Sequence, residues 1–335
     1  MIARSRLRCV GAAVAILLTS CTAAPDAGRS SPSPTSEEPV IANPVYPFDF
    51  PDPQVLLDSD GFLAIATNGN GMNVQTIRGE QLGEWQQGSD ALPQVAPWST
   101  SGKVWAPEII AWPDGGYRLY YTTRAPDPNW QCVSVATSDA LAGPYVDESA
   151  APLVCEIDEG GSIDASPFLD VDGTPYLYWK NDGNAVGVDT WIRVAPLSDD
   201  GLALAGETTN LFMQDLPWEG HLVEAPAVVL VDGVYHMFYS ANDYGSDRYA
   251  VGHAVADSPL GPFVKDPDPV LVTNDVAAGP GHCQLFLSEG RWWMVFHAWL
   301  PGHVGDSAFG RQMWLTTVDF DGASVAVRQP SATLD

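Results

Sequence analysis

The feature that most constrains the fold is a short segment that recurs five times along the chain. Each copy has an apolar stretch, a turn built on Asp-Gly or Glu-Gly, and a second stretch of alternating aromatic residues. The copies begin at Asp52 (DPQVLLDSDGFLAIAT), Ala106 (APEIIAWPDGGYRLYYTTR), Ala165 (ASPFLDVDGTPYLYWK), Ala225 (APAVVLVDGVYHMFYSAND) and His282 (HCQLFLSEGRWWMVFHAW). Asp-Gly between alternating apolar runs is a strong β-hairpin signal. Each copy is therefore predicted to form one hairpin.

The spacing of the copies predicts how the hairpins assemble. The turn glycines are 54, 58, 60 and 57 residues apart, and they are Gly61, Gly115, Gly173, Gly233 and Gly290. Further strand-like stretches, such as CVSVATS and YAVGHAVA, lie between the hairpins. Four strands in a unit of this length form a propeller blade. The sequence therefore predicts an all-β, five-bladed β-propeller over residues 43–335. A β-sandwich with irregular hairpins is the alternative.

The N-terminus has the pattern of an export signal. Three arginines precede an apolar run, Val10–Leu18, that is too short to span a membrane. The run ends in Leu18-Thr19-Ser20-Cys21, which resembles a bacterial lipobox. We expect residues 1–20 to be a lipoprotein signal peptide and residues 21–42 a lipidated cysteine followed by a flexible Ser/Pro-rich tether. The protein would then be anchored to the outer face of the bacterial cell membrane; an ordinary secretory peptide is the alternative.

The cysteines are compatible with export, because exported proteins can hold disulfides. Beyond the N-terminal segment the chain has Cys132, Cys155 and Cys283. Cys132 and Cys155 lie on neighbouring apolar β-like stretches, so we expect them to pair. Cys283 would then be a buried thiol, although the sequence alone cannot establish the partners.

The charge of the chain limits its partners. The formal net charge is -27 at pH 7. Nucleic-acid binding needs a basic face that neutralises phosphates, so nucleic acid is excluded as a partner. An anionic membrane surface is disfavoured for the same reason, which leaves the lipid anchor as the expected membrane contact. A neutral substrate such as a sugar suits this charge best.

Charged or ionisable residues stand near the start of each hairpin: Asp52, Glu108, Asp164, Glu224 and His282. The first strand of each blade lines the central channel of a propeller, so these side chains are predicted to converge near the axis. Carboxylates packed together raise one another's pKa, which is costly for a purely structural arrangement. Glycoside hydrolysis uses such a set, with one acid for the leaving oxygen and one base for water.

These residues belong to stretches that resemble glycoside hydrolase family 43, the five-bladed propeller enzymes of arabinan and xylan breakdown. The matching stretches are NPVYPFDFPDPQV, VWAPEII, SIDASPFLD, VEAPAVV, GPGH and GRQMW. The resemblance implies an inverting mechanism with Asp52 as general base and Glu224 as general acid. It also implies that Asp164 tunes and orients the acid, and that Arg311 reaches the substrate. No cofactor is expected to be required, although His282 would lie near an axial calcium ion held through waters.

Several assignments near the site have alternatives. We prefer Asp52 over Asp49 as the base, because Asp52 leads directly into the first strand of its blade. Trp105 is expected to floor the sugar pocket or else to be a core residue. Glu108 is assigned to structure, and Lys180 is expected to lie outside the pocket. His282 is equally compatible with an ordinary core histidine.

The predicted function is therefore an inverting glycoside hydrolase acting on arabinose- or xylose-containing polysaccharides or oligosaccharides. An α-L-arabinofuranosidase or arabinanase is the first choice, and a β-xylosidase is the second. A non-catalytic propeller that binds polysaccharide is the alternative from another class, although such a protein has no need of three acids. We expect a monomer with a single catalytic module.

Overall fold

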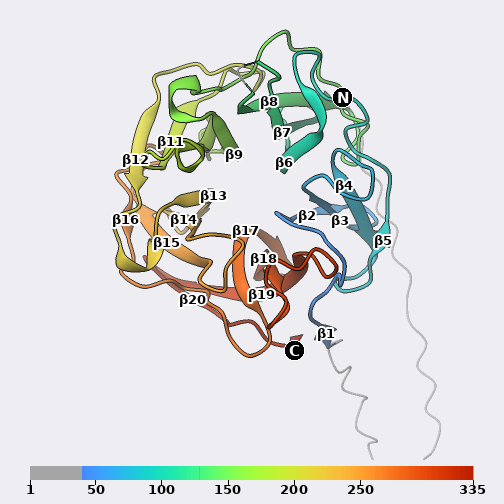
Figure 1. The fold of residues 1–335 in the computed structure, drawn as a ribbon, viewed down its shortest axis with the longest axis vertical. Coiled ribbons are helices and arrows are strands. Elements are labelled where there is room, and N and C mark those ends of the chain that lie inside the picture. The colour runs from blue at the N-terminus through green and yellow to red at the C-terminus, as the bar shows by residue number, and fades with distance from the viewer. Residues whose placement is uncertain (1–39, 128, 335) are drawn as a thin grey trace, which may run out of the picture. The chain divides into compact units, whose positions relative to one another are not determined.

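The computed structural model describes residues 40–127 and 129–334. Five antiparallel sheets stand in a ring (Figure 1), and the first strand of each sheet lies nearest the centre. The predicted five-bladed β-propeller is confirmed. The predicted signal peptide and the lipidation site at Cys21 lie outside the described residues.

Each blade is built from consecutive strands that pair in chain order. Blade one comprises β2 (Gln54–Asp58), β3 (Gly61–Ala66), β4 (Gln75–Gly79) and β5 (Gln86–Gln87). Blade two comprises β6 (Thr100–Ala111), β7 (Tyr117–Arg124) and β8 (Gln131–Ser138). Blade three comprises β9 (Ser162–Leu169), β10 (Pro175–Asn181), β11 (Trp191–Pro196) and β12 (Thr209–Met213).

The last two blades follow the same plan. Blade four comprises β13 (Val223–Val231), β14 (Val234–Ala241), β15 (Ala250–Ala256) and β16 (Val264–Lys265). Blade five comprises β17 (Ala278–Ser288), β18 (Arg291–Trp299), β19 (Gln312–Asp321) and β20 (Ser324–Val327). In all five blades, the first two strands are the hairpin that the repeated segments predict.

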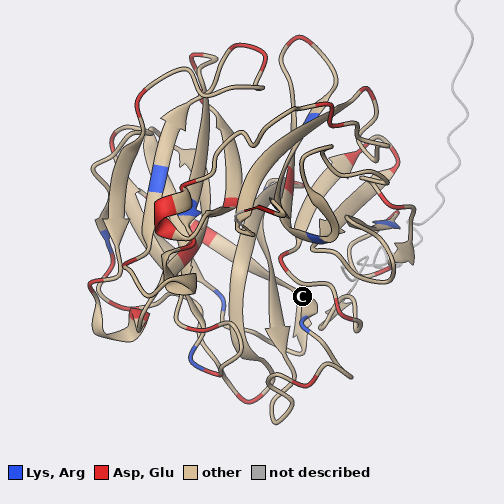
Figure 2. Cartoon of the chain, turned by 45° about the horizontal axis from the view of Figure 1, so that its top comes forward, with Lys and Arg blue, Asp and Glu red and all other residues tan. Residues whose placement is uncertain are grey.

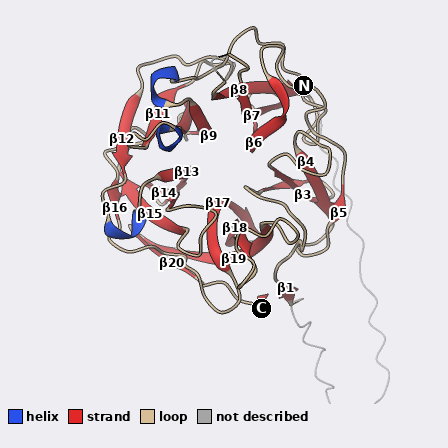
Figure 3. Ribbon diagram, viewed as in Figure 1, coloured by secondary structure: helices blue, strands red, loops and turns tan. Residues whose placement is uncertain are grey.

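Helical structure in the described residues is limited to short 3₁₀ turns between strands (Figure 3). They are η1 (Ile157–Glu159), η2 (Gly183–Ala185) and η3 (Pro217–Glu219). None of the helices in residues 40–127 and 129–334 has the length and apolar character to cross a membrane.

The apolar core is divided among the five interfaces between neighbouring blades. Successive residues of a strand point to opposite faces of the sheet, so each blade packs against both neighbours. On β7, for example, Tyr121 packs against blade one, whereas Tyr120 packs against blade three. On β10, Trp179 faces blade two and Tyr178 faces blade four. Burial on both faces explains why the second strand of each repeat is rich in aromatic residues.

The segment before blade one closes the ring against blade five. Strand β1 (Ile41–Ala42) pairs with β21 (Thr333–Leu334), and Tyr46 forms a bridge with Met313 of β19. The side-chain amide of Asn43 donates a hydrogen bond of 2.9 Å to the carbonyl of Leu315. This closure leads the chain past β19 directly into Asp52, the first predicted site residue.

Cys132 and Cys155 are joined by a disulfide, with their Cα atoms 4.8 Å apart. Cys132 lies on β8, and Val154 forms a bridge with its neighbour Val133. The bond therefore holds the segment after blade two against the outer strand of that blade. Cys283 on β17 is a free, fully buried thiol.

The acidic residues responsible for the net charge lie mostly on the surface loops around the ring (Figure 2). Basic residues are few, and the sequence contains 15 Lys and Arg against 42 Asp and Glu. The exposed surface of the described domain is therefore unsuited to polyanionic partners.

Candidate active site

A backbone kink recurs at the innermost strand of every blade. One residue there adopts left-handed φ values between 44° and 57°, in the order Asp52, Ala106, Asp164, Ala225 and His282. The hydrogen-bond register shifts beside the kink in β6, β9, β13 and β17. The equivalent positions therefore differ from the predicted set in two blades, because Glu108 lies two residues after its kink and Glu224 one residue before.

A cavity of about 730 Å³ opens where these strands converge. It brings together all six predicted catalytic and substrate-binding residues: Asp52, Trp105, Asp164, Glu224, His282 and Arg311. Residues of the lining that the sequence analysis did not single out include Thr67, Arg124, Asp182, Asn184, His221, Asn242, Tyr244, Arg248 and Tyr249. The cavity draws on all five blades and is rich in hydrogen-bonding groups, as a sugar site requires.

Asp52 is buried among cationic and hydrogen-bonding groups. Its Oδ1 accepts a 2.9 Å hydrogen bond from Arg311 and lies 3.4 Å from His282 Nδ1, while its Oδ2 accepts a hydrogen bond from the Thr67 hydroxyl. Burial by itself would raise the pKa of Asp52. The charges of Arg311 and His282 outweigh that effect and hold the pKa well below its ordinary value. Asp52 is therefore ionised at neutral pH.

Arg311 is placed by the loop before β19. Its guanidinium lies over the Tyr244 ring, 4.7 Å from the centroid, and its backbone N–H donates to Asp49 Oδ1 at 2.9 Å. Asp49 thus supports Arg311 from outside the cavity, whereas Asp52 lines it. This geometry favours Asp52 over Asp49 as the reacting carboxylate.

Asp164 lies on β9 and has the opposite electrostatic character. Burial raises its pKa to about 6 against the lowering effect of His282, and repulsion from Glu224 adds to the rise. Repulsion from Glu224 is larger than that from Asp52. Asp164 Oδ2 also accepts a 2.9 Å hydrogen bond from the backbone N–H of Ala225, the residue after Glu224. Asp164 therefore interacts more strongly with Glu224 than with Asp52.

Glu224 on β13 is held at both oxygens. Tyr249 donates its hydroxyl to Oε1 at 2.7 Å, and Lys180 donates to Oε2 at 3.1 Å. The expectation that Lys180 lies outside the pocket is wrong, because its fully buried ammonium lines the cavity. The repeats contain a signal that Lys180 belongs to the site. Lys180 occupies the same place after its turn glycine as Ser240 and His297 do after theirs.

Glu108 and Trp105 have different environments. Glu108 is buried and is not among the residues that line the cavity, and it accepts hydrogen bonds from Ser166 and Gln284. Burial raises the pKa of Glu108 well above its ordinary value, and repulsion from Asp164 contributes. Trp105 is half-buried and lines the cavity, where its indole can face a sugar ring.

His282 is buried, with Nδ1 toward Asp52. Among the residues that the structure describes, no group of three or more His, Cys, Asp or Glu side chains has the arrangement to hold a metal ion directly. Calcium near His282 stays a prediction.

A smaller hollow of about 380 Å³ adjoins the cavity. The two share the lining residues His221, Asn242, Arg248 and Tyr249, which form the boundary between them. Trp218, from η3, contributes an aromatic side chain to the smaller hollow.

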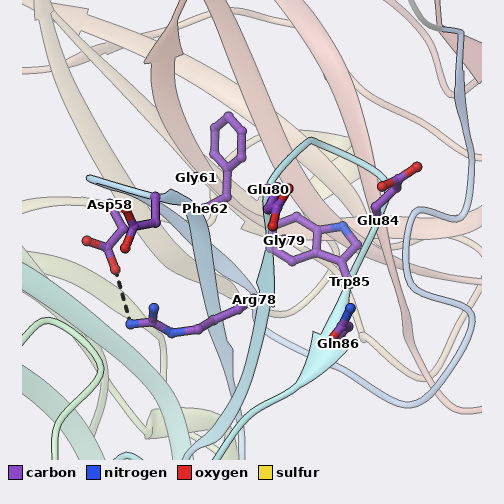
Figure 4. Close-up of a pocket in the computed structure, with 10 residues that line it drawn as sticks. Asp58, Gly61, Phe62, Arg78, Gly79, Glu80, Glu84, Trp85 and Gln86 are labelled. Atoms are coloured by element: carbon purple, nitrogen blue, oxygen red, sulfur yellow. Dashed lines mark ion pairs between the residues drawn. The ribbon is translucent and has the colours of Figure 1, made fainter.

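A third hollow lies at the opposite end of blade one (Figure 4). It is lined by the start of β3, the end of β4 and the loop that carries Trp85, and Arg78 pairs with Asp58 at 3.1 Å. Phe62 and Trp85 are partly buried and pack against the core of the blade. Their rings therefore contribute to core packing, and we assign this hollow no function.

The chemistry available in the main cavity is acid–base catalysis. Asp52 is kept ionised by neighbouring cations, whereas burial raises the pKa of Asp164 to about 6. Glycoside hydrolysis needs carboxyl groups in two such different environments.

Comparison with known proteins identifies the family. The model for glycosyl hydrolases family 43 matches residues 41–323. The chain belongs to glycosyl hydrolase family 43. This family 43 protein is a glycoside hydrolase, and the non-catalytic alternative is not favoured.

Curated relatives of this family 43 enzyme are named for several different activities. It is 29% identical over 301 residues to a β-D-galactofuranosidase of Aspergillus niger, covering 85% of this chain and 83% of that protein. It is 41% identical over 253 residues to a β-xylosidase of Xylanibacter ruminicola, covering 67% and 73%. It is 26% identical over 229 residues to an arabinoxylan arabinofuranohydrolase of Paenibacillus polymyxa, covering 61% and 33%.

The fold also agrees with solved structures. A thermostable family-43 glycoside hydrolase superposes with a TM-score of 0.80 at 28% identity, covering 88% of this chain and 98% of that one. The near-complete coverage means that the two share the whole propeller.

Proposed function

We propose that this enzyme is an inverting hydrolase that releases α-L-arabinofuranosyl units from arabinose- or xylose-containing plant polysaccharides or oligosaccharides. The observation that carries the mechanism is the contrast between two buried carboxylates of one cavity. The pKa of Asp52 is held well below its ordinary value, whereas that of Asp164 is raised to about 6. A base must be ionised at the working pH, as the environment of Asp52 provides. The raised pKa of Asp164 marks the part of the cavity beside the proposed acid, Glu224, as one that disfavours ionised carboxylates.

In the proposed reaction, Asp52 accepts a proton from a water molecule as the water oxygen attacks the anomeric carbon. Glu224 donates a proton to the glycosidic oxygen as the bond between that oxygen and the anomeric carbon breaks. Asp164 repels the ionised form of Glu224 and so helps it to keep its proton until the transfer. Arg311 fixes Asp52 and, with Trp105, contacts the sugar.

Three sugars are candidates for the unit that is released. An arabinofuranoside is supported by the arabinofuranohydrolase relative, and a β-xyloside by the relative with 41% identity. The Aspergillus niger relative spans more of the chain and favours a β-D-galactofuranoside as a further candidate. Arabinofuranose and galactofuranose are both five-membered rings, whereas xylosides of xylan are six-membered. Hydrolysis rates of the three 4-nitrophenyl glycosides, compared at equal concentration, distinguish the candidates.

The acid and base roles are tested with paired substrates. Asp52→Ala should abolish hydrolysis of every substrate, because water is no longer activated. Glu224→Ala should slow natural glycosides by about 10²–10⁴-fold and aryl glycosides with good leaving groups far less. Proton NMR of the first product should show an inverted anomer. Equal losses on both substrate types would reject Glu224 as the acid, and a retained anomer would reject the mechanism.

We also propose that the enzyme is exported and anchored through lipid on Cys21. The proposal rests on the lipobox-like sequence Leu18-Thr19-Ser20-Cys21. The disulfide between Cys132 and Cys155 supports it, because such bonds persist in oxidising compartments. Cys21→Ala should move the enzyme from the membrane fraction to the soluble fraction of bacterial cells. Unchanged sedimentation with membranes would rule the anchor out.

A further inference from the structure

The blades are connected around the axis by a ring of hydrogen bonds. In each blade, the residue with left-handed backbone conformation donates its backbone N–H to a side chain of the preceding blade. Four of the acceptors lie at the end of the second strand or directly after it. The pairs are Asp52 with His297 at 3.1 Å, Ala106 with Thr67 at 2.8 Å, Asp164 with Thr122 at 3.2 Å and His282 with Ser240 at 2.8 Å.

The fifth connection is different. The second-strand position in blade three is Lys180, and an ammonium group has no lone pair with which to accept a hydrogen bond. The backbone N–H of Ala225 is bound instead by Asp164 Oδ2 at 2.9 Å. Because lysine stands where the other blades have a hydrogen-bond acceptor, Asp164 is the acceptor for the backbone N–H of Ala225, the residue that follows Glu224.

The ammonium of Lys180 has its own set of partners. It donates to Glu224 Oε2 at 3.1 Å and to Asn184 Oδ1 at 2.7 Å, and it lies 3.9 Å from Asp182 Oδ1. Its side chain is 0% exposed. A buried ammonium is stable only with such compensation, since an isolated charge removed from water is strongly destabilised.

We propose that Lys180 is a positioning residue of this active site, which fixes the Glu224 carboxyl group and counterbalances the repulsion that Asp164 exerts on it. This inference rests on the proposed role of Glu224 as general acid. Asp164 makes the proton on Glu224 harder to lose, and Lys180 makes it easier to lose. The two charges therefore act on Glu224 in opposite directions, and the 3.1 Å contact from Lys180 also fixes the orientation of its carboxyl group.

The balance predicts opposite changes when either charge is removed. Lys180→Met keeps a long apolar side chain but removes the charge. The basic limb of the kcat/KM pH profile should then move upward by about one to three pH units, because Glu224 retains its proton to higher pH. Asp164→Asn should move the same limb downward. Lys180→Arg keeps the charge and should restore most of the wild-type profile.

Lys265 offers a matched control. It is another buried lysine, 8% exposed, and it pairs with Glu219 at 2.7 Å on the outer part of blade four. Lys265→Met should alter thermal stability without moving either limb of the pH profile. A purely structural role for Lys180 would give the same pattern in Lys180→Met.

The deciding measurement is independent of turnover. Carbon-13 NMR of enzyme labelled at glutamate side-chain carboxyls, with Glu224→Gln for assignment, follows the titration of Glu224 directly. We expect this titration to move to higher pH in Lys180→Met and to stay near its wild-type position in Lys180→Arg. An unchanged titration in Lys180→Met overturns the inference. If the titration moves but Glu224→Ala fails the leaving-group test, the proposed acid role is wrong while the coupling stands.

Discussion

The clearest test of the site's electrostatics is a stability measurement on Asp164→Asn. Asparagine has nearly the same shape as aspartate, and its side-chain oxygen can still accept the hydrogen bond from Ala225. The substitution therefore removes the ionisable group with little change in packing. Although it should impair activity, we expect it to make the protein more stable at neutral pH.

The magnitude follows from the raised pKa of Asp164. The value rises from 3.8 to about 6, chiefly because burial disfavours the charged form. At about 1.36 kcal/mol per pKa unit, ionised Asp164 lowers the folding stability by about 3 kcal/mol. The change in melting temperature is about 5 °C for a domain of this size, because unfolding entropy scales with the number of residues.

The pH dependence has a definite sign. Below pH 3.8, Asp164 is protonated in both the folded and the unfolded protein and makes no difference to stability. Between pH 3.8 and about 6, the folded protein binds more protons at this site, so wild-type stability falls as the pH rises. Above pH 6 the full penalty is present. Asp164→Asn should therefore match the wild type near pH 4 and exceed it by a constant amount above pH 7.

Urea unfolding followed by tryptophan fluorescence at pH 4, 5, 6, 7 and 8 measures this difference. Asp139→Asn is a suitable control, since it removes the same charge from an exposed position. It should show no comparable change between pH 4 and pH 8. A difference for Asp164→Asn that is the same at every pH, or a loss of stability at pH 8, would refute the electrostatic account.

Two further substitutions probe the neighbours of the proposed base and acid. Arg311→Met should raise the pKa of Asp52, so the acidic limb of the kcat/KM profile should move upward by about one pH unit; an unmoved limb would contradict the ion pair's role. Gly281→Ala should lower kcat for natural glycosides, because the new Cβ would lie 2.0 Å from the Tyr249 ring and displace the hydroxyl that Tyr249 donates to Glu224. Wild-type kcat in a folded Gly281→Ala enzyme would show that this hydrogen bond is dispensable.

The architecture was accessible from the sequence because it repeats. Each hairpin has a turn signal and an alternating apolar pattern, and the even spacing of the turns indicates identical units. Such local signals can be recognised in a single sequence without an alignment. The closure of the ring by Asn43 and Tyr46 against blade five was not predicted, because it depends on pairing between residues more than 260 positions apart.

The details of the site were less accessible. Aligning the repeats by their charged residues treated Glu108 and Glu224 as equivalents of Asp52, whereas the backbone kink falls on Ala106 and Ala225. A bulge shifts the register without changing the hydrophobic pattern, so the sequence carries little sign of it. Lys180 was misplaced for a related reason. Lysine is mostly exposed in proteins, and its burial here depends on partners from η2 and blade four.

The charges around the cavity also indicate how its protons are divided. Asp52 is surrounded by Arg311 and two histidines, so its proton is lost first as the pH rises. Burial and repulsion from Glu224 raise the pKa of Asp164 to about 6, and the titration steps of interacting groups belong to the pair rather than to either residue. The acidic limb of a bell-shaped pH profile should therefore report Asp52. The basic limb should report Asp164 and Glu224 together. Its position should change when the charge of Lys180, which contacts Glu224, is removed.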